Sequence, residues 1–186
     1  MPSPIAHLGA GYAIYRYYKR KLPENRGSLW KFPLQMLLIM GLSLLPDVDI
    51  IAAIIFRDME NYHNNFSHSL LLAIPVALLI AAIVRLLYHS DFWLWFLICL
   101  ISYDLHIIMD ALIAERGVMM FWPLSQNRFV SPIGIFYGLQ WGLGWFSLWH
   151  LWTIFTESLF VLVLIIVVNY FDKGKKAGKA VLSQEK

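Results

Sequence analysis

Residues 61–69, with the sequence Asn-Tyr-His-Asn-Asn-Phe-Ser-His-Ser, place two histidines between two long apolar segments. Imidazole nitrogens and carboxylate oxygens are ligands that proteins use for zinc and related metals. Histidines five residues apart do not share one helical face, but they suit a loop followed by the start of a helix. A lone loop histidine is usually just solvated. His63 and His68 therefore predict a metal site only if other ligands converge on them.

His106 and Asp110 are the first such partners. They are four residues apart in an apolar stretch, so they share one face of the expected helix. Ionisable residues inside a membrane span are costly and usually functional. The alternative is a polar pair that hydrogen-bonds inside a helical bundle.

Two further carboxylates, Asp47 and Asp49, follow Pro46, where a turn lets both converge. The alternative is that one of them caps a helix and the other is solvated. His7 joins the set only because the other residues converge. The predicted metal ligands are therefore His7, Asp47, Asp49, His63, His68, His106 and Asp110.

This set exceeds the three protein ligands typical of one catalytic zinc, so a centre of one or two ions is expected. One ion would activate water, and both would stabilise the oxygens of an in-line displacement. Asp49 and Asp47 are the predicted catalytic carboxylates, with Asp49 foremost as general base. Zinc is the first choice of metal, with manganese or iron as alternatives.

The composition indicates an integral membrane protein. Of the 186 residues, 59% are hydrophobic and 15% are charged, whereas soluble domains are about half apolar and a quarter charged. The length suits one domain. The single cysteine, Cys99, excludes an internal disulfide and a cysteine-based zinc site. Basic residues flank the membrane segments, so no nucleic-acid partner is expected.

The pattern predicts an all-α, polytopic transmembrane bundle of four to five spans. Residues 1–171 would form one domain, and residues 172–186 a basic, disordered cytoplasmic tail. Ser3 is an expected N-cap, and Ser67 or Ser69 is expected to cap the helix over 69–88. The expected segments are helices over 3–18, 33–45 with a break at Pro46, 69–88, 92–114 and 150–171, and an interfacial or re-entrant stretch over 132–149.

Lys and Arg predict the orientation. Twelve of the fifteen lie in residues 16–31, at Arg85 and in the tail, which should be cytoplasmic. Arg57, Arg116 and Arg128 remain for the other side. The candidate ligands then lie at the outer membrane face.

Five short motifs occur in order: Pro4-Ile-Ala-His7, then residues 45–49, 63–69, 106–110 and 117–125. Together they resemble the YdjM-type family of inner-membrane-bound metal-dependent hydrolases. The family's usual loop resembles His-Arg-Gly-x-Ser/Thr-His-Ser, whereas Asn64-Asn65 replace Arg-Gly here. A more distant similarity, to the helical zinc phospholipase C and single-strand nuclease group, implies phosphoester hydrolysis.

The sequence thus predicts a hydrolase of a lipid or lipid-linked phosphoester in the inner membrane. Two other classes stay open. In a metal carrier, polar residues would continue across the bundle to the cytoplasmic face, whereas the sequence of the spans below the site is apolar. A structural or regulatory membrane protein would bind no metal. Roles for Arg128, His150 and Glu157, and the oligomeric state, stay open.

Overall fold

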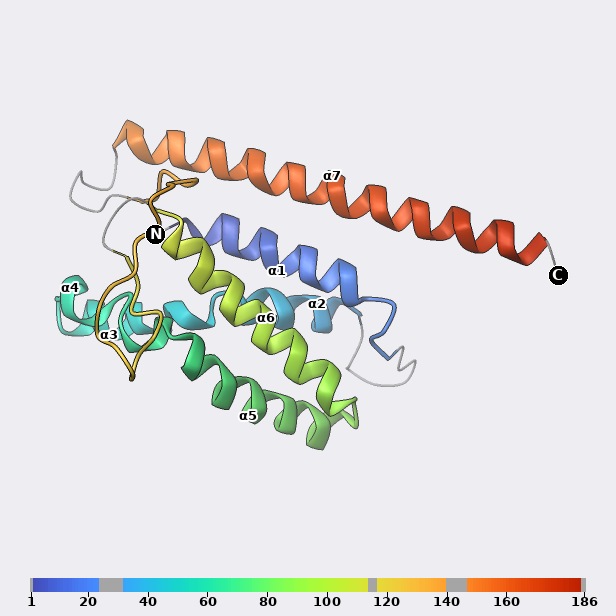
Figure 1. Ribbon diagram of the computed structural model, residues 1–186, viewed down its shortest axis with the longest axis horizontal. Coiled ribbons are helices and arrows are strands. Elements are labelled where there is room, and N and C mark those ends of the chain that lie inside the picture. Colours follow the sequence, from blue (N-terminus) through green and yellow to red (C-terminus); the bar gives the residue numbers. More distant parts are fainter. Residues whose placement is uncertain (1, 24–31, 114–116, 140–146, 185–186) are drawn as a thin grey trace.

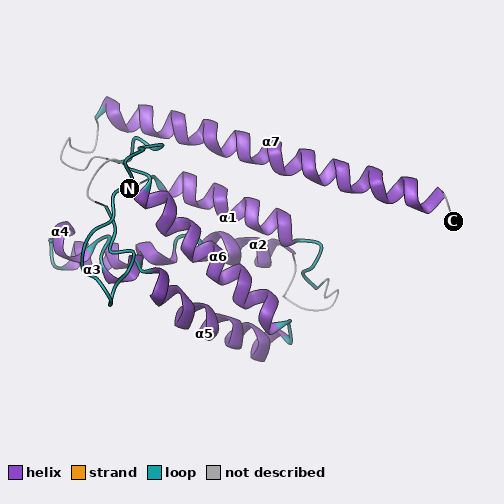
Figure 2. Cartoon of the chain, in the orientation of Figure 1, coloured by secondary structure: helices purple, strands orange, loops and turns teal. Residues whose placement is uncertain are grey.

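The structure is a computed structural model that describes residues 2–23, 32–113, 117–139 and 147–184, and it is mainly helical (Figure 2). The prediction of an all-α protein is confirmed, since the described residues contain only isolated β-bridges and no strand. The long helices lie alongside one another (Figure 1). They are α1 (Pro4–Tyr18), α2 (Phe32–Leu42), α5 (Leu70–Tyr88), α6 (Phe92–Ala111) and α7 (Leu148–Gln184).

Among the described residues, three helical segments are long and apolar enough to cross a membrane: Leu70–Tyr88, Phe92–Ala111 and Leu148–Phe171. A fourth span results if the bent pair Pro33–Leu42 and Leu45–Ile55 counts as one. The helix α1 has 15 residues, fewer than the roughly 20 that a full span needs. The expected four to five spans roughly fit this arrangement.

The break in the second span positions two of the predicted ligands. Helix α2 ends at Leu42, before the expected end at residue 45, and a 3-10 helix, η1 (Leu45–Val48), leads into α3 (Asp49–Ile55). The two halves are bent by 66°. Pro46 lies in the first turn of η1, where its missing N–H leaves no helical hydrogen bond unmade. The break therefore precedes the proline, and Asp47 and Asp49 follow at the bend.

Helix α1 packs closely against α2 because Gly11 has no side chain. A Cβ atom there would lie 2.8 Å from Cα of Met40 and 2.6 Å from Oγ of Ser43. That close approach lets the Ser43 hydroxyl donate to the carbonyl of His7 at 2.8 Å. The N-terminal part of α1 is thereby fixed against the break after α2.

The last helix, α7, is tied to α1 at two levels. Both oxygens of the buried Glu157 carboxylate accept from the Ser3 amide at 2.9 Å, and the Ser3 hydroxyl also donates to Glu157. Further along, Arg16 donates to Oδ1 of Asn169 at 2.8 Å. Ser3 is also the N-cap of α1, as expected. The buried carboxylate thus anchors the start of the first helix to the last one.

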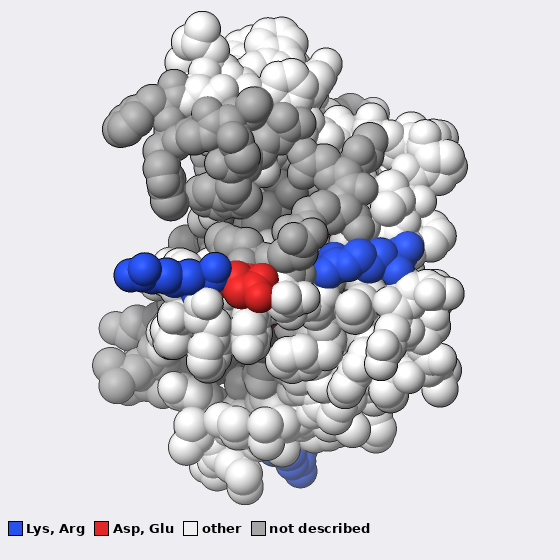
Figure 3. Space-filling view, turned by 90° about the vertical axis from the view of Figure 1, so that its left-hand side faces the viewer, with Lys and Arg blue, Asp and Glu red and all other residues white. Residues whose placement is uncertain are grey.

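The start of α1, the helices α3 and α4 (Met59–Tyr62) and the loop around residues 117–139 lie at one end of the bundle, which we call the site end (Figure 1). The chain's C-terminus lies at the opposite end. Charged side chains are sparse among the described residues visible on the site end (Figure 3). Residues 19–23, just after α1, and the last turn of α5, which carries Arg85, lie at the end opposite the site end (Figure 1).

Two predicted segments need separate comment. Helix α7 continues to Gln184, through the residues expected to form a disordered tail. The expected interfacial stretch over 132–149 lies partly outside the described residues. In its described part, residues 132–139 are irregular, and Tyr137 packs edge-on against Trp149 and Trp152.

Candidate metal centre

The centre is built from the ends of helices at the site end. His106 and Asp110 lie in the last turns of α6, which ends at Ala111. His68 ends the 3-10 helix η2 (Phe66–His68), just before Ser69, which of the two expected candidates is the N-cap of α5. Asp47 lies on η1, at the break. His68, His106 and Asp110 are buried, whereas Asp47 is largely but not fully buried.

Four side-chain atoms converge: Nε2 of His68, Nε2 of His106, Oδ1 of Asp47 and Oδ2 of Asp110. The two histidine nitrogens are 3.3 Å apart. Asp110 lies 3.0 Å from His68 and 3.2 Å from His106. Asp47 lies 3.5 Å from each histidine.

These five separations are close to those between neighbouring ligand atoms of a tetrahedral ion. Zinc–nitrogen and zinc–oxygen bonds of about 2.0–2.1 Å place neighbouring ligands about 3.3 Å apart in a regular tetrahedron. Among the described residues, Oδ1 of Asp47 and both oxygens of Asp110 accept no hydrogen bond. Buried carboxylate oxygens without donors are rare, and a cation accounts for them. The four residues therefore fit a divalent metal, with two imidazoles and two carboxylates.

The backbone just after the end of α2, outside the metal centre itself, orients His106. Its Nδ1 lies 2.7 Å from the backbone carbonyl of Ser43, which the end of α2 leaves outside the regular helix. A carbonyl only accepts, so Nδ1 carries the proton and Nε2 presents its lone pair to the centre. Such contacts orient metal-binding histidines in many proteins. The role of Ser43 was not predicted, because only a backbone atom takes part.

Asp49 orients His68 in the same manner. Its Oδ2 lies 3.3 Å from Nδ1 of His68, while Nε2 faces the four-atom cluster. The hydroxyl of Ser67 donates to the same oxygen at 2.5 Å and lies 3.1 Å from Nδ1. Tyr103 on α6 donates to the carbonyl of Ser67 at 2.6 Å and so holds η2 against α6.

His63 meets the other oxygen of Asp49. Its Nδ1 lies 2.8 Å from Oδ1, and the Asn64 amide donates to Oδ2 at 3.1 Å. Asp49, His63 and His68 also form a second group with metal-ligand spacing. His68 offers Nδ1 to that group and Nε2 to the first one. The structure thus brings His63 and Asp49 beside the first cluster, with Asp49 surrounded by donors.

His7 is the one predicted ligand from α1. Its ring stacks on His106 with centroids 3.8 Å apart, and its Nε2 lies 3.4 Å from Oδ1 of Asp110. The side chain is fully buried, yet neither ring nitrogen has a hydrogen-bond partner among the described residues. Buried imidazole nitrogens without hydrogen-bond partners are rare, and an ion, a water or a substrate at this place would satisfy them.

The loop after α6 covers the 61–69 segment. The Ser69 hydroxyl donates to the carbonyl of Trp122, and the Leu70 amide donates to that of Met120 at 3.1 Å. Arg128 donates to Oδ1 of Asn65 at 2.5 Å and to the carbonyl of Gly117 at 3.1 Å. Its guanidinium thus joins the covering loop to the asparagine that replaces the family's usual glycine.

The charges of the centre favour a bound cation. Burial lowers the pKa of His68, but the carboxylates of Asp110, Asp47 and Asp49 outweigh burial and hold this pKa well above its ordinary value. Three carboxylates around two imidazoles leave negative charge in a buried place. Either a proton or a metal ion compensates it, and metal binding then displaces the proton.

The sequence model of the YdjM inner membrane protein family matches residues 1–176. The chain belongs to the YdjM inner membrane protein family. A relative, inner membrane protein YbcI of Escherichia coli (strain K12), is 32% identical over 100 residues, which are 49% of this chain and 54% of that protein. The match thus spans about half the length of the relative. No solved structure matches the chain.

Membership of the YdjM family confirms the resemblance of the five motifs and shows an inner membrane protein. The structure adds that all five motifs meet at the site end. They supply His7, the bend at 45–49, the loop at 63–69, the end of α6 and the covering loop at 117–125. The five motifs of the sequence analysis thus coincide with the candidate metal centre.

Proposed function

We propose that this YdjM-family protein is a metal-dependent hydrolase that cleaves a phosphoester of a lipid or lipid-linked substrate. The observation that supports this most is the near-tetrahedral arrangement of His68, His106, Asp47 and Asp110 with carboxylate oxygens that lack hydrogen-bond donors. These four residues would hold a metal ion with a purely structural role equally well. The free imidazole of His7 beside them favours chemistry, because it adds a group that can take or give a proton.

The ligand set suits zinc first, since imidazole and carboxylate are common zinc ligands, and manganese or iron second. A divalent ion bound there would polarise a phosphoryl oxygen and make a nearby water more acidic. A second ion, if present, would use Asp49 and His63 with the second nitrogen of His68. The contacts of Asp49 with four donor groups support a positioning role for this carboxylate rather than that of general base.

In this proposal His7 holds the transferable proton. Its Nε2 faces Asp110, and the stack on His106 fixes the ring. Asp47 is the most exposed of the four residues in the cluster, so the substrate would approach from its side.

The position of the centre supports a lipid substrate. Its residues lie at the ends of α5 and α6 and at the start of α1, where spans meet the headgroup layer. By the positive-inside rule the opposite end, with most of the Lys and Arg, is cytoplasmic, and the site end is extracytoplasmic. This orientation is part of the proposal.

A metal carrier is less well supported. A carrier needs a polar path across the bundle, whereas beyond the site α1, α2, α5 and α6 enclose a core of apolar and aromatic side chains. Ile14, Ile39, Ala81, Trp95 and Ile98 are among its buried members.

The test uses the purified full chain in detergent. Metal content is measured by mass spectrometry, and hydrolysis is screened over phospholipids and isoprenoid phosphates with and without a chelator. We expect a transition metal to copurify and chelation to abolish hydrolysis, which metal restores. Fully metallated protein that cleaves no ester tried, or activity insensitive to the chelator, would contradict the proposal.

A further inference from the structure

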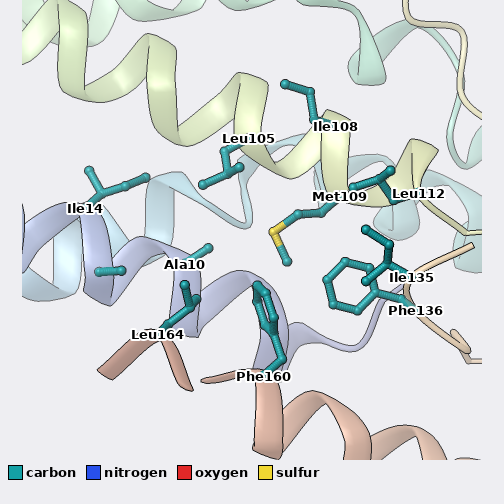
Figure 4. Close-up of a pocket in the computed structure, with 11 residues that line it drawn as sticks. Ala10, Ile14, Leu105, Ile108, Met109, Leu112, Ile135, Phe136, Phe160 and Leu164 are labelled. Carbon is teal, nitrogen blue, oxygen red and sulfur yellow. The ribbon is translucent and has the colours of Figure 1, made fainter. Parts of the chain in front are cut away.

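A pocket of about 330 Å³ lies between α1, α6, α7 and the segment around Phe136 (Figure 4). Its volume falls in the range of about 300–1,000 Å³ that is usual for ligand pockets. All its lining residues are apolar; they are Ala10, Ala13, Ile14, Leu105, Ile108, Met109, Leu112, Ile135, Phe136, Phe160 and Leu164. A ligand here therefore finds no hydrogen-bonding side chain.

The pocket begins at the level of the metal centre. On α1, Ala10 lies one helical turn beyond His7, and on α6, Met109 immediately precedes Asp110. On α7, Phe160 lies one turn beyond Glu157. Helices α1 and α7 run away from the site end and α6 runs towards it (Figure 1). The pocket thus extends from the site towards the middle of the spans.

One side of the pocket faces outwards. Ala10 and Met109 on its inner wall are each 3% exposed, whereas Ile108 is 44% and Ile135 is 58% exposed. On a membrane span the outward direction is lipid, so the molecules that reach this opening are those of the bilayer. The lining on α6, from Leu105 to Leu112, covers about 10 Å of helix axis. That is too short for a partner's transmembrane helix, which needs a contact strip along a span.

We propose that this pocket binds one hydrocarbon chain of the lipid whose headgroup ester lies at the metal centre. The inference rests on the proposed hydrolase function and names the part of the substrate that the metal ligands do not contact. The chain would enter between Ile108 and Ile135 and lie against Met109 and Phe160. The phosphoester would then be held at the level of His7, where α1 and α6 meet.

The experiment maps lipid contacts without relying on turnover. The full chain is placed in nanodiscs of phosphatidylethanolamine and phosphatidylglycerol, in which some phosphatidylglycerol carries a diazirine on one acyl chain. After illumination, labelled peptides are located by mass spectrometry. Ala13→Phe narrows the pocket, and Ile108→Trp fills its exposed opening without altering the interior. Ala82→Phe on α5 is the matched control, since Ala82 is also partly buried but lies outside the pocket.

We expect labels to concentrate in peptides containing residues 105–112 and 160–164, to fall several-fold in both pocket variants and to persist in Ala82→Phe. Labels spread evenly over the lipid-facing helices, or unchanged in both pocket variants, would overturn the inference. So would cross-links to a second protein chain at this pocket. Metal content, measured on the same samples, separates the two proposals: its absence contradicts the hydrolase, whereas unselective labelling of metallated protein contradicts only the chain site.

Discussion

Oδ2 of Asp49 lies 3.3 Å from Nδ1 of His68, across the imidazole ring from the nitrogen that faces Asp47 and Asp110. A carboxylate in this place holds the ring and makes it a better donor to a metal. Asp49 thus acts on the centre through His68, and this arrangement underlies the first prediction.

Asp49→Asn is expected to weaken metal binding by about 10- to 100-fold, the usual loss when a contact behind a metal ligand is removed. Titration calorimetry of the stripped protein with zinc measures it. Asp58→Asn is the control, because Asp58 contacts the exposed Asn61. If Asp49→Asn binds zinc with unchanged affinity, Asp49 has no positioning role. If this variant loses turnover but keeps its zinc affinity, Asp49 is the general base instead.

His106→Ala with His68→Ala should remove the metal altogether, since two of four ligand atoms are lost. Elemental analysis of protein that still elutes as a folded species decides this. A double variant that retains one equivalent of metal would show that the ion sits elsewhere.

His7→Gln should keep the metal and lose most turnover. Gln fills similar space but cannot take up a proton, and His7 lies outside the group of four. Turnover on the best substrate and metal content are measured together. If His7→Gln loses metal first, His7 is a ligand, as the sequence analysis suggested.

Gly11→Ala should lower the free energy of unfolding by about 1–3 kcal/mol, the cost of overpacking a tight contact. The new Cβ would meet the backbone of Met40, which cannot rotate away. Gly41→Ala is the matched control, because nothing lies within 4 Å of its Cβ position, and alanine should stabilise that helix slightly. Thermal unfolding in detergent gives both values; equal shifts would argue against the close packing of α1 on α2.

The orientation can be tested with single cysteines introduced in a Cys99→Ser background. Lys176→Cys should be protected from a membrane-impermeant maleimide in intact cells, whereas Glu60→Cys should react. The basic residues at the end opposite the site motivate this expectation. The reverse labelling pattern would place the metal centre in the cytoplasm.

Much of this arrangement follows from local sequence. Helix caps at Ser3 and Ser69, apolar spans and the four-residue spacing of His106 and Asp110 depend on neighbours along the chain, so the sequence predicts them well. It also predicts which side chains gather at one end, because short connections force the spans to alternate in direction.

The contacts behind the ligands were beyond sequence analysis. The Ser43 carbonyl is available only because α2 ends three residues earlier than expected, and such a shift depends on packing against α1. Glu157, whose role the sequence left open, accepts hydrogen bonds from Ser3 across 154 positions. No periodic pattern reveals a pairing between the first and last helices.

That pairing bears on how the protein is made. His7 is carried by α1, and α1 is anchored at its start by a carboxylate near the beginning of α7, which leaves the ribosome after the other described helices. Until α7 inserts, the Ser3 amide lacks its acceptor, and α1 is held only by its contacts with α2 and α6. The start of α1 is therefore fully anchored only after α7 has been made, and a nascent chain that lacks α7 carries all the metal-binding motifs without this anchor.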